Sequence, residues 1–103
     1  MRIKPLRLID AALAEYEQQY DDLFLHSVTK ADRFRSEILK GFYAIAAKPN
    51  EYGYVAGYTF RSYGPTKKEK YRIAYVETAN EIIVIAIYYS GSSNPHYWVK
   101  RAF

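Results

Sequence analysis

The strongest structural signal in the chain lies in Tyr71–Tyr89, which reads YRIAYVETANEIIVIAIYY. Its second half contains the apolar run Ile82–Ile87, which is too short to span a membrane and too rich in β-branched residues to favour a helix. Turn-forming residues flank this run, as is typical of a strand buried on both faces. The first half, Tyr71–Val76, alternates as a half-buried strand does. The two halves predict an antiparallel hairpin that needs helices and further strands packed on it.

Two amphipathic helices are predicted upstream of this hairpin. From Ile9 the apolar residues recur with the helical period, on a stripe formed by Ile9, Ala12, Leu13, Tyr16, Tyr20, Leu23 and Phe24. This pattern predicts a helix of about four turns. A second helix is expected to open with a capping box at Thr29–Asp32 and to end at Lys48, before Pro49. Helices joined by so few residues form an antiparallel hairpin.

The remaining segments complete the expected order of elements. Met1–Leu8 is expected to hold a first or edge strand, because Pro5 removes a hydrogen-bond donor from the ladder. Tyr58–Tyr63 is expected to be a short strand, and Pro95–Phe103 to form a last helical turn or to dock on the sheet. The sequence therefore predicts one α+β domain over residues 1–103, in the order β-α-α-β-β-β, with the helical hairpin on a small, mostly antiparallel sheet.

The composition is that of an ordinary globular protein, with 50% hydrophobic and 25% charged residues. The chain has no cysteine, which excludes disulfides and thiolate metal sites and fits a reducing compartment. Acidic residues soon interrupt the first apolar patch. We therefore expect no signal peptide, no contact with a membrane and a cytoplasmic location.

Charge is divided unevenly along the chain. Through Asp32 there are four basic and six acidic residues, whereas the rest carries a net charge of +6. Such a split fits a C-terminal half that meets a polyanion or an acidic partner, and it fits a soluble surface with clustered lysines equally well. The densest basic cluster comprises Lys67, Lys68, Lys70 and Arg61. This cluster is a candidate contact for phosphate or an acidic protein, and a solvated loop is the plainer interpretation.

Three segments resemble the RelE/ParE toxin superfamily. Tyr71–Val76, YRIAYV, looks like that family's YR(V/I)xY strand, and Asn94–Trp98, NPHYW, is similar to the end of its H-G-R-R-x-P-x-Y-W tail. Ile45–Pro49, IAAKP, resembles the Leu-Ala-x-x-Pro phrase that often ends the family's second helix. The resemblance implies the toxin of a bacterial type II toxin–antitoxin pair. Its cognate antitoxin would form a hetero-oligomer with it.

The family has two activities, and the residues of this sequence must be compared with the requirements of each. RelE-like toxins cleave mRNA in the ribosomal A site, whereas ParE-like toxins inhibit DNA gyrase. Metal-free RNA cleavage needs a group that takes the 2′-hydroxyl proton, cations that stabilise the phosphorane and an acid for the leaving oxygen. The resemblance makes Arg72 the candidate phosphate contact. Arg61 is a candidate second cation, and Tyr97 lies near the place of a catalytic tyrosine in some ribonucleases of the family.

Other positions depart from the ribonuclease pattern. Ser92 and Ser93 replace the basic pair that the family carries after its long strand, and Tyr89 or Ser90 occupies the place of its histidine. Losing these groups weakens transition-state stabilisation. We therefore favour a ParE-like inhibitor of DNA gyrase without a cofactor. The alternatives are a ribosome-dependent mRNA endoribonuclease and a toxin-derived interaction module without toxicity.

Several residues have a structural interpretation beside the functional one. Arg72 is expected either to bind phosphate or to pair with Glu77 or Glu81 across the hairpin. Trp98 is a candidate binding residue with the Lys67–Arg72 edge, although a tryptophan at such a place more often closes the core. An antitoxin is expected to add a helix or a strand along the hairpin and the sheet.

The two histidines do not predict a metal site. His26 is expected at a helix end and His96 on the surface of the tail. They are far apart in sequence and have no clustered acids beside them, so no metal ligand set is expected.

Overall fold

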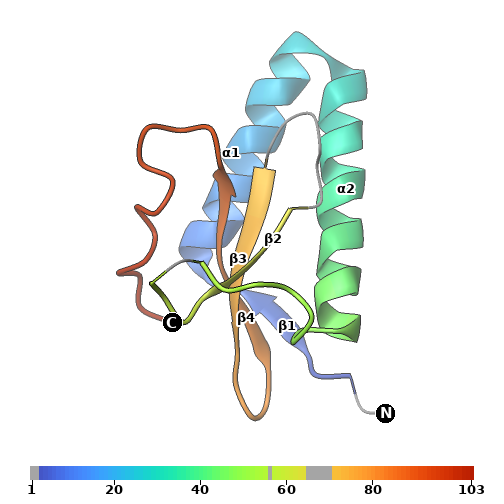
Figure 1. Cartoon of the computed structure of the whole chain (residues 1–103). Helices are drawn as coiled ribbons and strands as arrows, with labels where there is room; N and C mark the ends of the chain where they lie inside the picture. The colour runs from blue at the N-terminus through green and yellow to red at the C-terminus, as the bar shows by residue number, and fades with distance from the viewer. Residues whose placement is uncertain (1–2, 56, 65–70) are drawn as a thin grey trace.

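The computed structural model describes residues 3–55, 57–64 and 71–103, which form two helices and a four-stranded sheet (Figure 1). In chain order the elements are β1 (Leu6–Leu8), α1 (Asp10–His26), α2 (Val28–Ala47), β2 (Arg61–Tyr63), β3 (Tyr71–Glu77) and β4 (Ile82–Tyr89). The predicted α+β class and the β-α-α-β-β-β order are confirmed.

The strands lie in the order β1-β4-β3-β2, so the last strand of the chain sits between the first and the third. β3 runs antiparallel to both β4 and β2, whereas β1 runs parallel to β4. The parallel pairing spans three residues of β1, from Leu6 opposite Ile82 to Leu8 opposite Val84. The sheet is therefore mostly antiparallel, as expected, and on the β1 side the second half of β4 has no described strand beside it.

Apolar side chains pack on both faces of this sheet. On one face the helices contribute Ala12, Phe34, Ile38 and Ile45, which pack on Ile73, Tyr75, Ile82, Val84 and Ile87. On the other face the loop before β2 and the C-terminal segment contribute Val55, Phe60 and Trp98, which pack on Ala74, Ile83, Ile85, Ala86 and Tyr88. The prediction that β4 is covered on both faces is confirmed. The prediction that β3 is half-buried is wrong, because Ala74 is as fully buried as its neighbours Ile73 and Tyr75.

The register of β3 against β4 shifts at the centre of the sheet. Ala74 lies opposite Ala86, but Tyr75 lies opposite Val84, so Ile85 is an extra residue in β4. A bulge of this kind bends its strand and lets two successive side chains point to the same face. Ile85 and Ala86 accordingly both belong to the core on the face away from the helices.

The turn between the helices is tighter than the sequence suggests. Ser27 has an extended backbone, and its N–H donates to the Leu23 carbonyl at 2.8 Å, which closes α1. The Ser27 Oγ also accepts the Lys30 N–H at 3.2 Å, which caps α2. The predicted cap at Thr29 is therefore wrong. One serine ends the first helix and begins the second, because its side chain satisfies a free N–H of the first turn of α2.

The C-terminal segment after Tyr89 docks on the sheet, which confirms that alternative; it contains hydrogen-bonded turns from His96 to Val99 and from Trp98 to Arg101, and no described regular helix. Trp98 anchors this segment in the second core. It is fully buried, its Nε1 donates to the Pro95 carbonyl at 2.8 Å, and its ring centroid lies 5.2 Å from those of Phe60 and Tyr88. The expectation that Trp98 closes the core is confirmed, and such a residue offers no surface to a partner.

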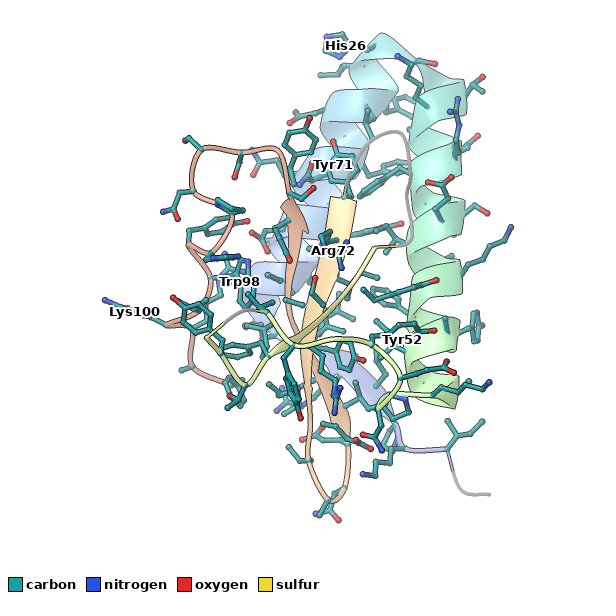
Figure 2. All side chains as sticks on the ribbon, viewed as in Figure 1. His26, Tyr52, Tyr71, Arg72, Trp98 and Lys100 are labelled. Atoms are coloured by element: carbon teal, nitrogen blue, oxygen red, sulfur yellow. The ribbon has the colours of Figure 1, made fainter. Side chains whose placement is uncertain are left out.

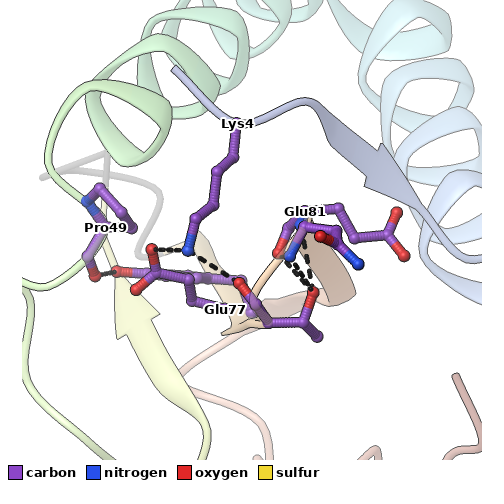
Figure 3. A network of polar contacts seen from close by, with 7 residues as sticks. Lys4, Pro49, Glu77 and Glu81 are labelled. Carbon is purple, nitrogen blue, oxygen red and sulfur yellow. Dashed lines mark hydrogen bonds and ion pairs between the residues drawn. The ribbon is translucent and has the colours of Figure 1, made fainter. Parts of the chain in front are cut away.

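Polar contacts tie the β3–β4 turn to neighbouring segments (Figure 3). Lys4 Nζ lies 2.8 Å from Glu77 Oε2, and Arg7 Nε lies 2.8 Å from Glu81 Oε1. These pairs are partly exposed, so each contributes at most about 1 kcal/mol. Tyr75 is different, because its buried hydroxyl donates to the Pro49 carbonyl at 2.6 Å and thereby fixes the end of α2 against the sheet.

Tyr75 predicts a loss of stability at alkaline pH. Burial raises the pKa of Tyr75 to about 12, and Arg61 offsets part of the rise. Because the folded-state pKa lies above the unfolded value of about 10, this contribution is fully present below pH 10 and is lost as pH rises towards 12. We expect Tyr75→Phe to cost about 1 kcal/mol at neutral pH through the lost hydrogen bond, and to remove part of the alkaline destabilisation.

Urea unfolding at several pH values up to about 11 measures this difference. Tyr43→Phe is the matched control, since Tyr43 is 78% exposed. Equal alkaline slopes for Tyr75→Phe and the unsubstituted protein would contradict the role given to Tyr75.

Candidate functional site

A cleft of about 400 Å³ opens on the sheet face away from the helices. Arg72 reaches it from β3, Ser62 from β2 and Tyr88 from β4. Figure 2 shows Arg72 near the first end of β3, with the C-terminal segment that carries Trp98 to one side. The loop before β2 and the C-terminal segment complete the walls, through Gly53, Tyr54, Val55, Ser90, Pro95 and His96.

The guanidinium of Arg72 is held in place by β2. Its Nε donates to Ser62 Oγ at 2.7 Å, and its Nη2 donates to the Ser62 carbonyl at 3.1 Å. The Ser62 hydroxyl also shares a hydrogen bond of 2.8 Å with the Tyr88 hydroxyl. This fixed chain of donors and acceptors crosses three strands, and it aims the arginine along the sheet into the cleft.

Gly64 makes room for this arrangement. A Cβ at position 64 would lie 2.6 Å from Arg72 Nη1, which is closer than van der Waals contact allows. Arg72 does not pair with either acid that the sequence suggests, because Glu77 binds Lys4 and Glu81 binds Arg7. The predicted ion pair of Arg72 across the hairpin is therefore wrong. The residue lies nearer the other end of β3 and finds its acceptors on β2.

Tyr54 lines the cleft from the loop before β2, and His96 lines it from the C-terminal segment. Tyr54 is 60% exposed, and the Arg61 guanidinium lies over its ring, 4.1 Å from the ring centroid. Arg61 also donates a hydrogen bond to the Tyr54 hydroxyl. His96 is exposed and packs its ring edge-on to Tyr58 and Trp98. The expectation that His96 is a surface residue is confirmed. Its place in the wall of the cleft with Arg72 was not predicted.

The cleft combines groups that suit a phosphate ester. A guanidinium offers planar, permanently charged donors that match phosphate oxygens. An imidazole is the side chain that most readily exchanges a proton near neutral pH. Hydroxyls and exposed aromatic rings beside them add hydrogen bonding and stacking. The arrangement can therefore bind a phosphate group, and His96 supplies a group able to move a proton beside it.

The residues proposed for RNA cleavage do not gather around Arg72. Successive residues of a strand point to opposite faces, and Arg61 lies opposite Tyr75, whereas Ser62 lies opposite Ala74. Arg61 therefore begins on the helix-covered face, where its Nη1 donates to the Tyr52 carbonyl. The side chains of Arg72 and Ser62 both project from the other face of the sheet. The proposed second cation does not line the Arg72 cleft, although its guanidinium packs on Tyr54, which does.

Tyr97 belongs to a different cluster. Its hydroxyl donates to Glu15 of α1, and Arg101 Nη1 lies 2.8 Å from the same carboxylate. Burial, followed by the hydrogen bond to Glu15, raises the pKa of Tyr97 well above its ordinary value. A phenol so bonded holds its proton, and it does not line the Arg72 cleft. The hydrogen bond to Glu15 likewise raises the pKa of Arg101.

Lys67, Lys68 and Lys70 lie outside the described residues, so the basic cluster remains a sequence-based prediction. His26 is the last residue of α1, as expected, with its Nδ1 2.9 Å from the Asp22 carbonyl oxygen. No group of three His, Asp or Glu side chains able to hold a metal ion is found in the described part of the chain. Neither described helix combines the length and apolar character that crossing a bilayer requires.

A second concave surface lies along the helical hairpin. It holds about 510 Å³ and is lined by Leu8, Leu13, Tyr16, Glu17, Tyr20, Asp21, Arg35, Leu39 and Phe42. Leu13 of α1 and Leu39 of α2 are 46% and 42% exposed. This helical groove is mainly apolar with a few charges at its margin, so it suits a protein segment better than a nucleic acid.

Sequence reasoning missed Ser62, Tyr88 and Gly64 as parts of the Arg72 cleft. Tyr88 gave a weak signal, since a tyrosine at the end of a buried apolar strand must place its hydroxyl beside a polar partner. Ser62 and Gly64 gave none, because their roles depend on the pairing of β2 with β3.

No family model matches the sequence, and a search of curated proteins finds no relative. Fold and site geometry must therefore carry the functional argument together with the motif resemblance.

Gly64→Ala is expected to move Arg72 without unfolding the protein. The added Cβ meets the far end of a flexible side chain, so Arg72 swings away and loses its bonds to Ser62, at a cost of about 1 kcal/mol. The Arg72 Nε–H resonance, followed by NMR, should shift and exchange faster with water. Gly53→Ala is the control, because a Cβ there meets nothing within 4 Å. An unchanged Arg72 signal in Gly64→Ala would contradict this account.

Proposed function

We propose that this chain is the toxin of a bacterial type II toxin–antitoxin pair, that it inhibits DNA gyrase by binding, and that a cognate antitoxin neutralises it. The proposal rests on the resemblance of Tyr71–Val76 and Asn94–Trp98 to the RelE/ParE superfamily. The agreement between the expected and observed order of elements supports it. In the fold these segments lie on one sheet, since the first forms most of β3 and the second docks Trp98 against β4.

The separation of Arg61, Arg72 and Tyr97 favours binding over catalysis. Arg61 leaves the helix-covered face of β2, and Arg72 lies on the opposite face beside Ser62. Tyr97 is bonded to Glu15 of α1. Of the three residues only Arg72 lines the cleft, so the residue set expected for RNA cleavage is not assembled there. This observation carries the choice of the ParE-like branch over the RelE-like one.

The helical groove supports the antitoxin part of the proposal. An amphipathic helix binds such a groove by burying apolar residues at its i, i+3, i+4 and i+7 positions. The half-exposed Leu13 and Leu39 would be covered by it. Glu17 and Asp21 on one margin and Arg35 on the other would select the charges that flank its apolar stripe.

The Arg72 cleft favours one second candidate, a ribosome-dependent endoribonuclease with a different residue set. Arg72 would stabilise the phosphorane charge, His96 would transfer a proton, and the Tyr88 hydroxyl would be a further donor. All three line one cleft. A toxin-derived module without toxicity remains the third candidate, for which the helical groove alone would be the functional surface.

A supercoiling assay with purified gyrase and relaxed plasmid tests the first candidate. We expect inhibition or trapped cleavage complexes at micromolar protein, with and without ATP compared. Arg72→Ala tests whether the Lys67–Arg72 edge is part of the contact, because it should weaken inhibition only if gyrase binds this residue. Absence of any effect on gyrase would sink the proposal.

Cleavage of mRNA on translating ribosomes tests the second candidate. There Arg72→Ala should lower the cleavage rate by about 10² to 10³, the effect of removing one donor that stabilises a transition-state charge. Lys100→Ala is the control, since Lys100 is exposed and does not line the cleft. Cleavage that survives Arg72→Ala in a folded protein would exclude this site. Inactivity of the unsubstituted protein in both assays would leave the module without toxicity.

A further inference from the structure

The outer edge of β4 is covered by a strand along only part of its length in the described structure. β1 pairs with Ile82–Val84, and the Ile9 N–H continues this pairing by donating to the Val84 carbonyl at 3.1 Å. The chain then turns into α1. From Ile85 onwards no described strand lies on this side of β4. The free main-chain groups of such an edge are a template for pairing with another chain.

The sequence of β4 makes this edge hazardous. Seven successive residues, from Ile82 to Tyr88, are apolar or aromatic and buried, and none carries a charge. Short segments with high β-propensity, low charge and no proline pair readily with copies of themselves. An open edge here would expose that segment to the same segment of a second molecule.

Two side chains occupy the place of the missing strand. Glu15 Oε1 accepts the Ile87 N–H at 3.2 Å, and Arg101 Nη1 donates to the Ile85 carbonyl at 3.1 Å. The same two side chains bind each other, at 2.8 Å from Nη1 to Oε1 and at 3.1 Å from Nη2 to Oε2. They are nearly buried, with side chains 15% and 22% exposed. The carboxylate and the guanidinium thus make the hydrogen bonds to the β4 edge that the backbone of a neighbouring strand would otherwise make.

We propose that Glu15 and Arg101 form an edge guard, which prevents β4 from pairing with β4 of a second copy of this chain. The two guarded groups are self-complementary. In an antiparallel pair related by a twofold axis beside Ala86, each Ile87 N–H would donate to the partner's Ile85 carbonyl. The bulge at Ile85 protects the same place, because a bend in an edge strand hinders regular pairing.

The guard closes only when the C-terminal segment is docked. Glu15 belongs to α1 and Arg101 follows it by 86 residues, so one half comes from each end of the chain. Tyr97 adds a hydrogen bond to the same carboxylate, and Arg101 lies over the Tyr97 ring at 5.2 Å from its centroid. Displacement of this segment would therefore open the β4 edge. This inference is independent of the proposed toxin function.

Arg101→Ala tests the guard in the full chain. Removal of the guanidinium leaves the Ile85 carbonyl without its donor and frees Glu15 to move. At low protein concentration we expect the Ile87 amide to exchange with solvent at least about tenfold faster than in the unsubstituted protein. Analytical ultracentrifugation should show a mass that rises with concentration towards a dimer. Protection of the Ile87 amide should return as the dimer forms, because the partner strand then accepts its hydrogen bond.

Glu17→Gln and Lys100→Ala are matched controls, since they alter exposed charges on the same helix and the same segment. Both should keep the mass and the Ile87 exchange rate of the unsubstituted protein. If Arg101→Ala does not fold, Arg101→Lys replaces it, since it retains the charge but cannot make both the Glu15 and the Ile85 bonds in the same geometry. A folded variant that keeps the unsubstituted mass at every concentration overturns the guard. Association that leaves the Ile87 amide unprotected overturns the β4 edge as the contact.

Discussion

The structure depends on the burial of β4 on both faces. A strand with seven successive buried residues cannot be satisfied by one helical layer, because its side chains alternate between two faces and each face needs apolar cover. The helical hairpin covers one face. The other face is covered by two irregular segments, the loop before β2 and the C-terminal segment after β4. Their central contact is that of Trp98 with Phe60 and Tyr88.

An irregular second cover explains where the Arg72 cleft lies. A helix would have closed the sheet face along its whole length, whereas a loop and a C-terminal segment meet at a few aromatic contacts and leave a hollow between them. Arg72 at the start of β3 and Tyr88 near the end of β4 then face that hollow. There the Ser62 hydroxyl bonds to the Tyr88 hydroxyl and accepts from Arg72, so both buried hydroxyls are satisfied and the guanidinium is held at the opening.

The helices and the burial of β4 on both faces could be predicted from the sequence, whereas the burial of β3 and the side-chain partners across strands could not. The apolar run of β4 and the stripe of α1 each carry their own signal, and both elements were correctly located. To predict the hydrogen-bond partner of Arg72, one must know whether its side chain reaches β4 or β2. The pairing register of β2 cannot be predicted from a strand of three residues. Thr29 and Ser27 are both suitable caps, and the choice between them follows from how closely α2 is packed after α1.

The placement of Arg61 and Arg72 on different faces of the sheet could not be predicted for the same reason, because it depends on the pairing register of β2. Position in a strand fixes the face of a side chain, so moving the pairing by one residue would have placed Arg61 in the cleft and Ser62 under the helices. The residues between Gly64 and Tyr71 carry no periodic pattern that sets this register. A sequence can therefore name two cations on neighbouring strands without showing whether they share a face.

Glu15 and Arg101 show why a buried ion pair persists where apolar packing is available nearby. Replacing a buried pair by apolar residues of similar volume is often harmless, because the desolvation cost of the charges disappears with their attraction. That exchange fails at the β4 edge. Apolar side chains there would leave the Ile85 carbonyl and the Ile87 N–H without partners, and each buried unpaired main-chain group costs about 1–3 kcal/mol. The charges are retained because they serve the backbone of a strand whose neighbour ends too soon.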